Sequence, residues 1–133
     1  MAGGRVGSVA GTHGGDGRRR TGAIGEAHAA GLIEARGGAV ISRNWRSRTG
    51  ELDLVVLDAG GRLRFVEVRT RSGTGFGTPA ESVTAAKQRR LRQLAGEWLA
   101  AHPGPWRQVC FDVIGVDLAD SSRPLLELFE DVF

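Results

Sequence analysis

The chain has 133 residues, of which 41% are hydrophobic and 25% charged, so it is long enough for one globular domain and too short for two. Its single cysteine excludes an internal disulfide, no apolar run is long enough to span a bilayer, and the N-terminus lacks the apolar core of a secretory signal. We therefore expect a cytoplasmic protein with no membrane partner. The formal net charge of +3 is a mild excess that is compatible with a polyanionic partner.

The N-terminal third of the chain is expected to hold a tail, a helix and a strand. Residues 1–20 are rich in glycine and nearly free of large apolar groups, which predicts a disordered Gly/Arg-rich tail. A helix is expected over 22–36, with Thr21 as its N-cap and Gly37-Gly38 at its end. Ala39–Arg46 then has the composition of a strand.

Two further strands are expected at Glu51–Leu57 and over 62–71, joined by the turn signal Asp58-Ala59-Gly60-Gly61. Thr78-Pro79-Ala80-Glu81 forms a capping box, so a second helix is predicted from Thr78 to about residue 101, before Pro103. Residues 107–117 are predicted to form a fourth strand.

The order α-β-β-β-α-β predicts an α/β domain over 21–118, with a mixed central sheet flanked by helices. Residues 119–133 would follow as a C-terminal tail or as a short edge strand at Leu125–Phe129.

Two acidic residues on neighbouring strands are the first candidate site. Side chains alternate faces along a strand, and both Asp53 and Glu67 continue faces that are otherwise apolar. If the hairpin loop is Ala59-Gly60-Gly61, Asp53 lies opposite Glu67, and Glu51 lies opposite Arg69. A Mg²⁺ ion between the two carboxylates would relieve their repulsion. The alternative is an ion-pair ladder in which Arg69 and Arg71 neutralise Glu51 and Asp53 without a metal.

Basic and aromatic residues form the second candidate set. Lys87 lies on the apolar stripe of the second predicted helix, so we expect it to face the sheet and meet a carboxylate, unless it extends toward solvent at the edge. Other residues could contact a nucleic acid through phosphates or base stacking, although solvated arginines and a packed tryptophan are the simpler interpretation. These candidates are Arg43, Trp45, Arg46, Arg71, Arg89 and Arg92.

Several short motifs occur in a characteristic order along the chain. Gly22-x-x-Gly25-Glu26 opens the first helix, Arg43-Asn44-Trp45-Arg46 ends the first strand, and Gly50-Glu51-Leu52-Asp53-Leu54 follows. Phe65-Val66-Glu67-Val68-Arg69, Phe76-Gly77-Thr78-Pro79, Lys87-Gln88 and Phe111-Asp112-Val113 complete the series. Over residues 22–116 this ordered series resembles the YraN family of small bacterial proteins.

The resemblance implies a fold like that of restriction endonucleases and archaeal Holliday-junction resolvases. It implies an acidic residue on one strand, matched by Asp53, and a Glu-x-Lys motif on the next, where Glu67 matches the glutamate. The acid of the first helix matches Glu26. This chain departs from the family at Arg69, which replaces the usual lysine and cannot act as a general base because arginine does not deprotonate in proteins.

These features predict three alternative functions. The first is an endonuclease that cuts DNA, branched or single-stranded, with Mg²⁺ or Mn²⁺ held by Asp53 and Glu67; Glu26 or Glu51 would orient a water, and Arg69 or Lys87 would stabilise the transition state. The second is a catalytically inactive nucleic-acid-binding module on the same fold. The third is a structural adaptor. Related resolvases act as dimers, so a homodimer is also left open.

Overall fold

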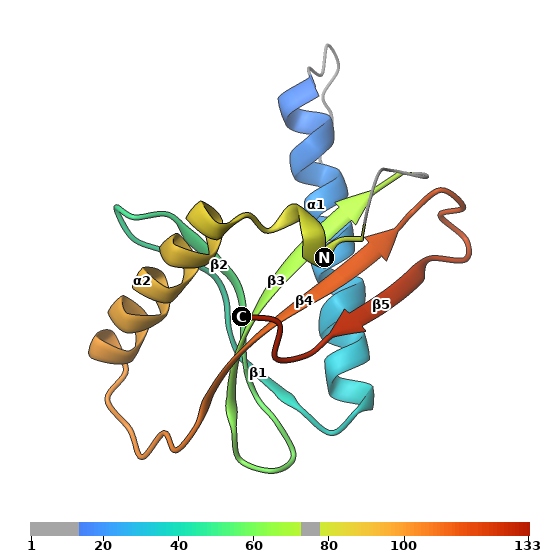
Figure 1. Cartoon of the computed structure of the whole chain (residues 1–133). Helices are drawn as coiled ribbons and strands as arrows, with labels where there is room; N and C mark the ends of the chain where they lie inside the picture. The colour runs from blue at the N-terminus through green and yellow to red at the C-terminus, as the bar shows by residue number, and fades with distance from the viewer. Residues whose placement is uncertain (1–13, 73–77) are drawn as a thin grey trace.

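The computed structural model describes residues 14–72 and 78–133, with side chains from Arg19 onward. Two helices, α1 and α2, a short 3-10 helix, η2, and five strands make up this part of the chain (Figure 1). Their bounds are α1 Gly14–Ala35, β1 Ala39–Arg46, β2 Glu51–Leu57, β3 Leu63–Arg71, η2 Ala80–Ser82, α2 Ala85–Ala101, β4 Val109–Asp117 and β5 Leu125–Phe129.

The strands of the described chain form one sheet in the order β1-β2-β3-β4-β5. Neighbouring strands are antiparallel except β3 and β4, which run parallel because the chain crosses over through η2 and α2 between them. The sheet is therefore mixed, and the predicted α/β class is confirmed.

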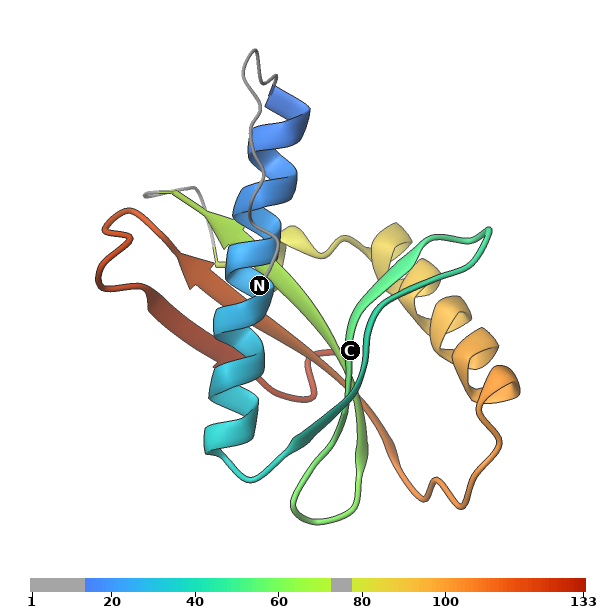
Figure 2. The ribbon, with the colours of Figure 1, turned by 180° about the vertical axis from the view of Figure 1, so that it is seen from behind.

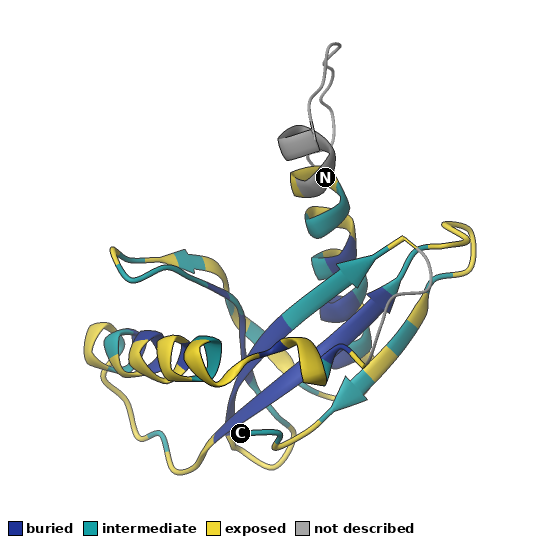
Figure 3. Ribbon diagram, turned by 45° about the horizontal axis from the view of Figure 1, so that its top comes forward, coloured by how far each residue is buried: buried dark blue, intermediate teal, exposed yellow. Residues whose placement is uncertain are grey.

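The helices pack on opposite faces of the sheet, which is why β2, β3 and β4 are apolar on both sides. Trp98 and Leu94 of α2 pack with Phe65 and Phe111 in one cluster, whereas Ile33 of α1 belongs to a second cluster on the other face. Viewed from behind, α1 crosses the sheet, and α2 lies beside the β1–β2 hairpin (Figure 2). The buried residues concentrate in β3 and β4, the middle of the structure (Figure 3).

The β2–β3 hairpin has the three-residue loop on which the pairing of Asp53 with Glu67 was conditional. Leu57 pairs with Leu63, and the Asp58 N–H donates to the Arg62 carbonyl at 2.9 Å. Gly61 has φ 85°, a conformation that glycine adopts readily and that a three-residue hairpin loop requires. This loop sets the register that places Asp53 across from Glu67.

The first helix begins earlier than predicted. It starts at Gly14 and not near Gly22, so residues 14–20, assigned to a disordered tail, are helical. Arginine is a good helix former and no proline interrupts this stretch, so the turns of 22–35 extend toward the N-terminus despite the glycines. The remaining predicted tail residues, 1–13, lie outside the described part.

The second helix begins later than predicted. The capping box forms, with the Glu81 N–H donating to Thr78 Oγ1 at 3.2 Å and the Thr78 N–H donating to Glu81 Oε1 at 2.8 Å, but it closes only the 3-10 turn η2. Val83 is extended and buried, and Thr84 is the N-cap of α2. Because Val83 is buried in an extended conformation, α2 begins only after Thr84, although the capping box at Thr78 predicts an earlier start.

The last fifteen residues complete the fold. Of the two alternatives for Leu125–Phe129, the structure has the edge strand, paired antiparallel with β4. After it, the Val132 N–H donates to the Phe111 carbonyl at 2.9 Å, and the Phe133 ring stacks on Phe111. Within residues 14–72 and 78–133, no helix has the length and apolar character needed to cross a membrane.

Candidate active site

The acidic pair lies where β2 and β3 separate. Leu54 and Val66 are the last paired residues at this end of the ladder, so Asp53 and Glu67 occupy the next position. There the Val68 N–H donates to Asp53 Oδ2 at 2.8 Å. A side-chain carboxylate thus satisfies a backbone donor at the point where the partner strand departs.

Glu67 is buried, with 7% of its surface exposed, and two cations reach it. Lys87 Nζ of α2 lies 2.9 Å from Glu67 Oε2, and Arg69 Nη1 of β3 lies 3.4 Å from the same oxygen. The expectation that Lys87 faces the sheet and meets a carboxylate is confirmed. Of the alternative ion-pair ladder, the pairing of Arg69 with Glu51 is replaced, because Arg69 contacts Glu67 and Glu51 contacts Arg46.

Asp53 carries the main electrostatic conflict of this cluster. Burial raises the pKa of its carboxyl, and the negative charge of Glu67 raises it further, to about 8, against the lowering effect of the Val68 N–H. Near neutral pH the pair therefore tends to hold a proton, and a bound cation would take the place of that proton.

Glu26 joins the cluster from α1. It follows Gly25, where a side chain would collide with Thr70, so glycine lets the helix approach β3 closely enough for Glu26 to reach the sheet. Burial raises the pKa of Glu26, the charges of Glu51 and Glu67 add to this rise, and a hydrogen bond from Asn44 works against it. All six residues predicted for the catalytic centre, Glu26, Glu51, Asp53, Glu67, Arg69 and Lys87, therefore interact within one cluster.

Asn44 belongs to the same cluster and was not predicted as a site residue. With its amide nitrogen turned toward the carboxylates, it donates to Glu26 Oε1 at 2.9 Å and to Glu51 Oε2 at 3.2 Å. Its backbone has φ 50°, a left-handed conformation that asparagine tolerates better than most residues. The sequence offered one indication, an asparagine inside an expected strand, where asparagine is uncommon. That indication alone does not predict that Asn44 bonds the two carboxylates.

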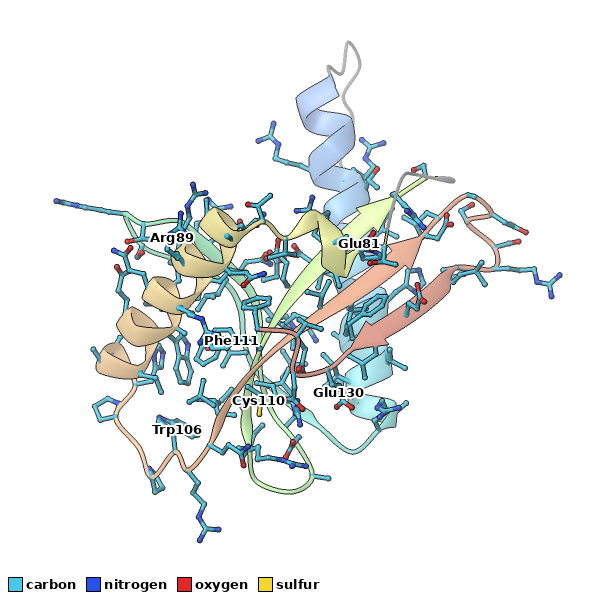
Figure 4. The ribbon with its side chains drawn as sticks, viewed as in Figure 1. Glu81, Arg89, Trp106, Cys110, Phe111 and Glu130 are labelled. Carbon is cyan, nitrogen blue, oxygen red and sulfur yellow. The ribbon has the colours of Figure 1, made fainter. Side chains whose placement is uncertain are left out.

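The residues predicted to contact nucleic acid fall into three environments. Arg43 and Arg46 are exposed on β1, where Arg43 Nη2 lies 3.9 Å from Glu34 Oε2, and Arg89 is exposed on α2 (Figure 4). Trp45 and Arg71 are half-buried, and Trp45 packs against the α2-side core with its ring at 69° to that of His102. The Arg92 guanidinium lies 4.9 Å from the centre of the Phe111 ring.

The donor set fits a hard cation that keeps part of its water shell. Among the described residues, no three or more His, Cys, Asp or Glu side chains are arranged to hold a metal ion, so a closed protein cage is not formed there. Mg²⁺ usually takes only one or two carboxylates and keeps several waters. Asp53 and Glu67 meet that smaller requirement.

A second polar cluster lies on the α1 face and was not predicted. Arg64 is buried, and it binds Asp58 Oδ2 through Nε at 2.8 Å and Asp112 Oδ1 through Nη1 at 3.0 Å. Arg64 and Asp112 line a pocket of about 200 Å³ near the C-terminal end of α1. Glu130, which follows β5 (Figure 4), also lines it. Because the carboxylates already pair with Arg64, we interpret this cluster as a structural network.

The fold and the motifs agree with the comparisons to known proteins. A UPF0102 protein of Nocardia farcinica is 47% identical over 116 residues, which cover 87% of this chain and 91% of the relative. A UPF0102 protein of Mycobacterium tuberculosis is 50% identical over 100 residues, which cover 74% of this chain and 78% of the relative.

Among solved structures, that of Pyrococcus furiosus SfsA in complex with Ca²⁺ aligns with 86% of this chain and 62% of that chain, at 14% identity and a TM-score of 0.31. This likeness is too weak to bear on function. The model of the family described as "Uncharacterised protein family UPF0102" matches residues 25–116, which include the C-terminal half of α1, strands β1 to β3, α2 and all of β4 except its last residue. The chain therefore belongs to the UPF0102 family, the YraN family that its motifs resemble.

Proposed function

We propose that this protein is a metal-dependent endonuclease that binds DNA and hydrolyses phosphodiester bonds with Mg²⁺ or Mn²⁺ held by Asp53 and Glu67. The observation that carries the proposal is the pair itself. Two carboxylates from adjacent strands meet where the sheet opens, and burial together with mutual repulsion raises the pKa of Asp53 to about 8. Such a conflict is typical of sites tuned for chemistry.

The chain's own residues have distinct roles in this proposal. A bound cation would supply a water of lowered pKa and shield the phosphate charge. Water adds to phosphorus as the bond to the leaving oxygen breaks, and that oxygen takes a proton. In this proposal Glu26 and Glu51 would accept hydrogen bonds from the water. Lys87 and Arg69, which both contact Glu67, would stabilise the added negative charge.

Lys87 can take the place of the lysine that Arg69 replaces in the family motif. The family motif supplies a lysine on β3, whereas in this chain a lysine reaches the same glutamate from α2, with Nζ 2.9 Å from Glu67 Oε2. An ammonium group is thus beside the carboxylate pair although β3 carries arginine. This placement supports activity in a chain that lacks the usual Glu-x-Lys motif.

A cleavage assay tests the proposal. Labelled single-stranded, duplex, flap and four-way-junction DNA would be incubated with Mg²⁺, Mn²⁺ or EDTA and with the wild type, Asp53→Asn or Glu67→Gln. Glu127→Gln, at an exposed position of β5, is the matched control. We expect cutting by the wild type and the control alone, abolished by EDTA, and a loss of about a thousandfold in each site variant.

The second candidate function is a DNA-binding module without catalysis, and Arg69 is the observation that favours it. Arg69→Lys and Lys87→Met separate the two candidates in the same assay. Cutting that appears only in Arg69→Lys would show that the natural chain is the inactive form. Cutting by the wild type that disappears in Lys87→Met would assign the amine to α2. No cutting by any variant, with DNA binding retained in EDTA, would overturn the endonuclease.

A further inference from the structure

We propose that the β1–β2 hairpin is a fixed arm whose tip, together with the first turns of α2, binds the sugar–phosphate backbone of DNA beside the acidic pair, and that Glu97 is its positioning residue. The proposal takes its partner, DNA, from the proposed function. It adds a binding surface of Arg46, Arg48, Arg89 and Arg90, called the arm surface, and a device that holds that surface in place.

Glu97 joins the arm to α2. Its carboxylate accepts a hydrogen bond from Ser47 Oγ at 2.5 Å through Oε1 and one from Thr49 Oγ1 at 2.6 Å through Oε2. Gln93 Nε2, one turn earlier on α2, donates to Thr49 Oγ1 at 3.4 Å. Both hydroxyls belong to the turn that closes the hairpin, where the Ser47 N–H donates to the Gly50 carbonyl at 2.9 Å. The tip is thus tied to a helix 50 residues away in sequence.

These hydrogen bonds leave the arginines uncompensated. In the part of the chain that the structure describes, none of Arg48, Arg89 and Arg90 forms an ion pair, and all three are exposed. Glu97, the acid that bonds the tip, is bonded to hydroxyls and not to a guanidinium. Exposed arginines held without acidic partners favour a polyanion over an acidic or neutral partner.

The arm surface is continuous with the acidic cluster. Arg46 is 77% exposed, and its Nε lies 3.3 Å from Oε2 of Glu51, which Asn44 also bonds. On α2, Arg90 follows Lys87 by three residues, about 4.5 Å along the helix axis. A methyl group on Gly50 would lie 3.6 Å from Arg90 Cδ, which places that arginine beside the tip. In Figure 4, Arg89 lies on the side from which the hairpin projects.

Fluorescence anisotropy with a short labelled DNA duplex tests the surface in EDTA, where no cleavage occurs. We expect Arg48→Ala/Arg90→Ala to weaken binding and to reduce the slope of log K against log salt by about 2, close to 1 for each phosphate contact. Arg107→Ala/Arg123→Ala removes the same charge at exposed positions elsewhere and should leave the slope nearly unchanged. Equal effects of the two double variants would overturn the arm surface.

A second set of variants tests Glu97. Glu97→Ala removes a negative charge beside the arm, so electrostatics alone predicts tighter binding, whereas loss of the positioning role predicts a several-fold rise in Kd. Ser47→Ala/Thr49→Val removes the same hydrogen bonds without a charge change and should also raise Kd, and Glu97→Gln should rescue part of the loss. Unchanged or tighter binding in both Glu97→Ala and the hydroxyl variant would overturn the positioning role.

The two proposals fail in different ways. Cleavage that is absent while Arg48→Ala/Arg90→Ala still weakens binding in EDTA would overturn the endonuclease alone. Cleavage that is present while both double arginine variants bind as the wild type does would overturn the arm alone.

Discussion

Asp53 shows how a single residue can weaken a fold while it prepares a site. Its carboxyl lies beside Glu67 at the end of a ladder, and the pKa of about 8 means that the folded protein holds a proton which the unfolded chain releases near pH 4. The folded state therefore loses stability from this residue as the pH rises from about 4 to about 8. A carboxylate kept at that cost is consistent with a functional role.

Asp53→Asn should accordingly raise the melting temperature in EDTA at alkaline pH. Asparagine cannot ionise, and its side-chain oxygen can still accept the Val68 N–H. Thermal melts at about pH 5 and about pH 9 check this, with the larger gain expected at the higher pH because the wild-type carboxyl is charged there. An equal gain in melting temperature at both pH values would contradict the raised pKa of Asp53.

Gly25 controls how closely α1 approaches the sheet. Gly25→Ala would drive a methyl group into Thr70, so we expect a loss of about 1–3 kcal/mol in the free energy of unfolding, as is usual for overpacking. Gly31→Ala is the matched control, because it lies on the same helix with nothing within 4 Å and should stabilise by about 0.5–1 kcal/mol. Urea unfolding of both variants measures the difference, and equal effects would contradict the close contact.

The limits of sequence reasoning at the scale of residues are visible in Asn44 and Arg64. The pairing of Asp53 with Glu67 could be predicted from the sequence, because a three-residue loop and the strand alternation determine which residues face each other. Asn44 depends on a left-handed backbone within a strand, and Arg64 on three acids from separate segments. Neither arrangement has a period or a motif that a single sequence displays.

The bounds of an element were predicted well where the local sequence alone determines both its residue pattern and its ends. β1 and β2 were predicted to the residue, because turns or glycines bound them directly. Both helix starts were wrong: α1 continues through residues 14–20, which their glycine-rich composition had assigned to a tail, and the start of α2 depends on tertiary structure. At α2, Pro79 packs over Gly115 of β4 and Val83 is buried, so the chain makes one 3-10 turn before the helix begins.

Asp58 holds the β2–β3 hairpin through hydrogen bonds with Gly60, Arg62 and Arg64. Burial works against the charged form, but hydrogen bonds from Arg64 and from the backbone and side chain of Arg62 lower the pKa of Asp58 to about 2. Since an unfolded aspartate titrates near 3.9, its contribution to stability is complete above about pH 4 and lost as the pH falls toward 2. The hairpin should therefore be a source of acid sensitivity.

Asp58→Asn tests this at two pH values. At about pH 7 the variant should lose about 1–3 kcal/mol in the free energy of unfolding, because charge-assisted hydrogen bonds to Arg62 and Arg64 are weakened while the backbone N–H donors keep an acceptor. At about pH 2, which is close to its pKa in the folded protein, the wild-type carboxyl is itself about half protonated, so the difference should shrink. Urea melts measure both values, and a constant difference would contradict the lowered pKa.

The whole molecule is built as two cores on one sheet, with a polar network at one end of it. Arg64 of β3 contacts the hairpin through Asp58, β4 through Asp112 and the C-terminal segment through Asp131. The Asp131 N–H in turn donates to Asp112 Oδ1 at 2.9 Å. The segment after β5 is thus held by charge at Arg64 as well as by the packing of Phe133 on Phe111.

Arg64→Met should destabilise the fold more than Gly25→Ala or Asp58→Asn does, because it leaves Asp112, only 2% exposed, without its cation. Breaking a buried pair in this way costs about 3–5 kcal/mol, whereas replacing both partners by apolar residues is often close to neutral. Arg64→Met/Asp112→Leu should therefore recover part of the loss, although the Asp131 N–H loses its acceptor. Urea unfolding with an unchanged m-value measures both variants. A double variant less stable than Arg64→Met would show that Asp112 supports the fold mainly through the C-terminal segment, and that the ion pair with Arg64 is secondary.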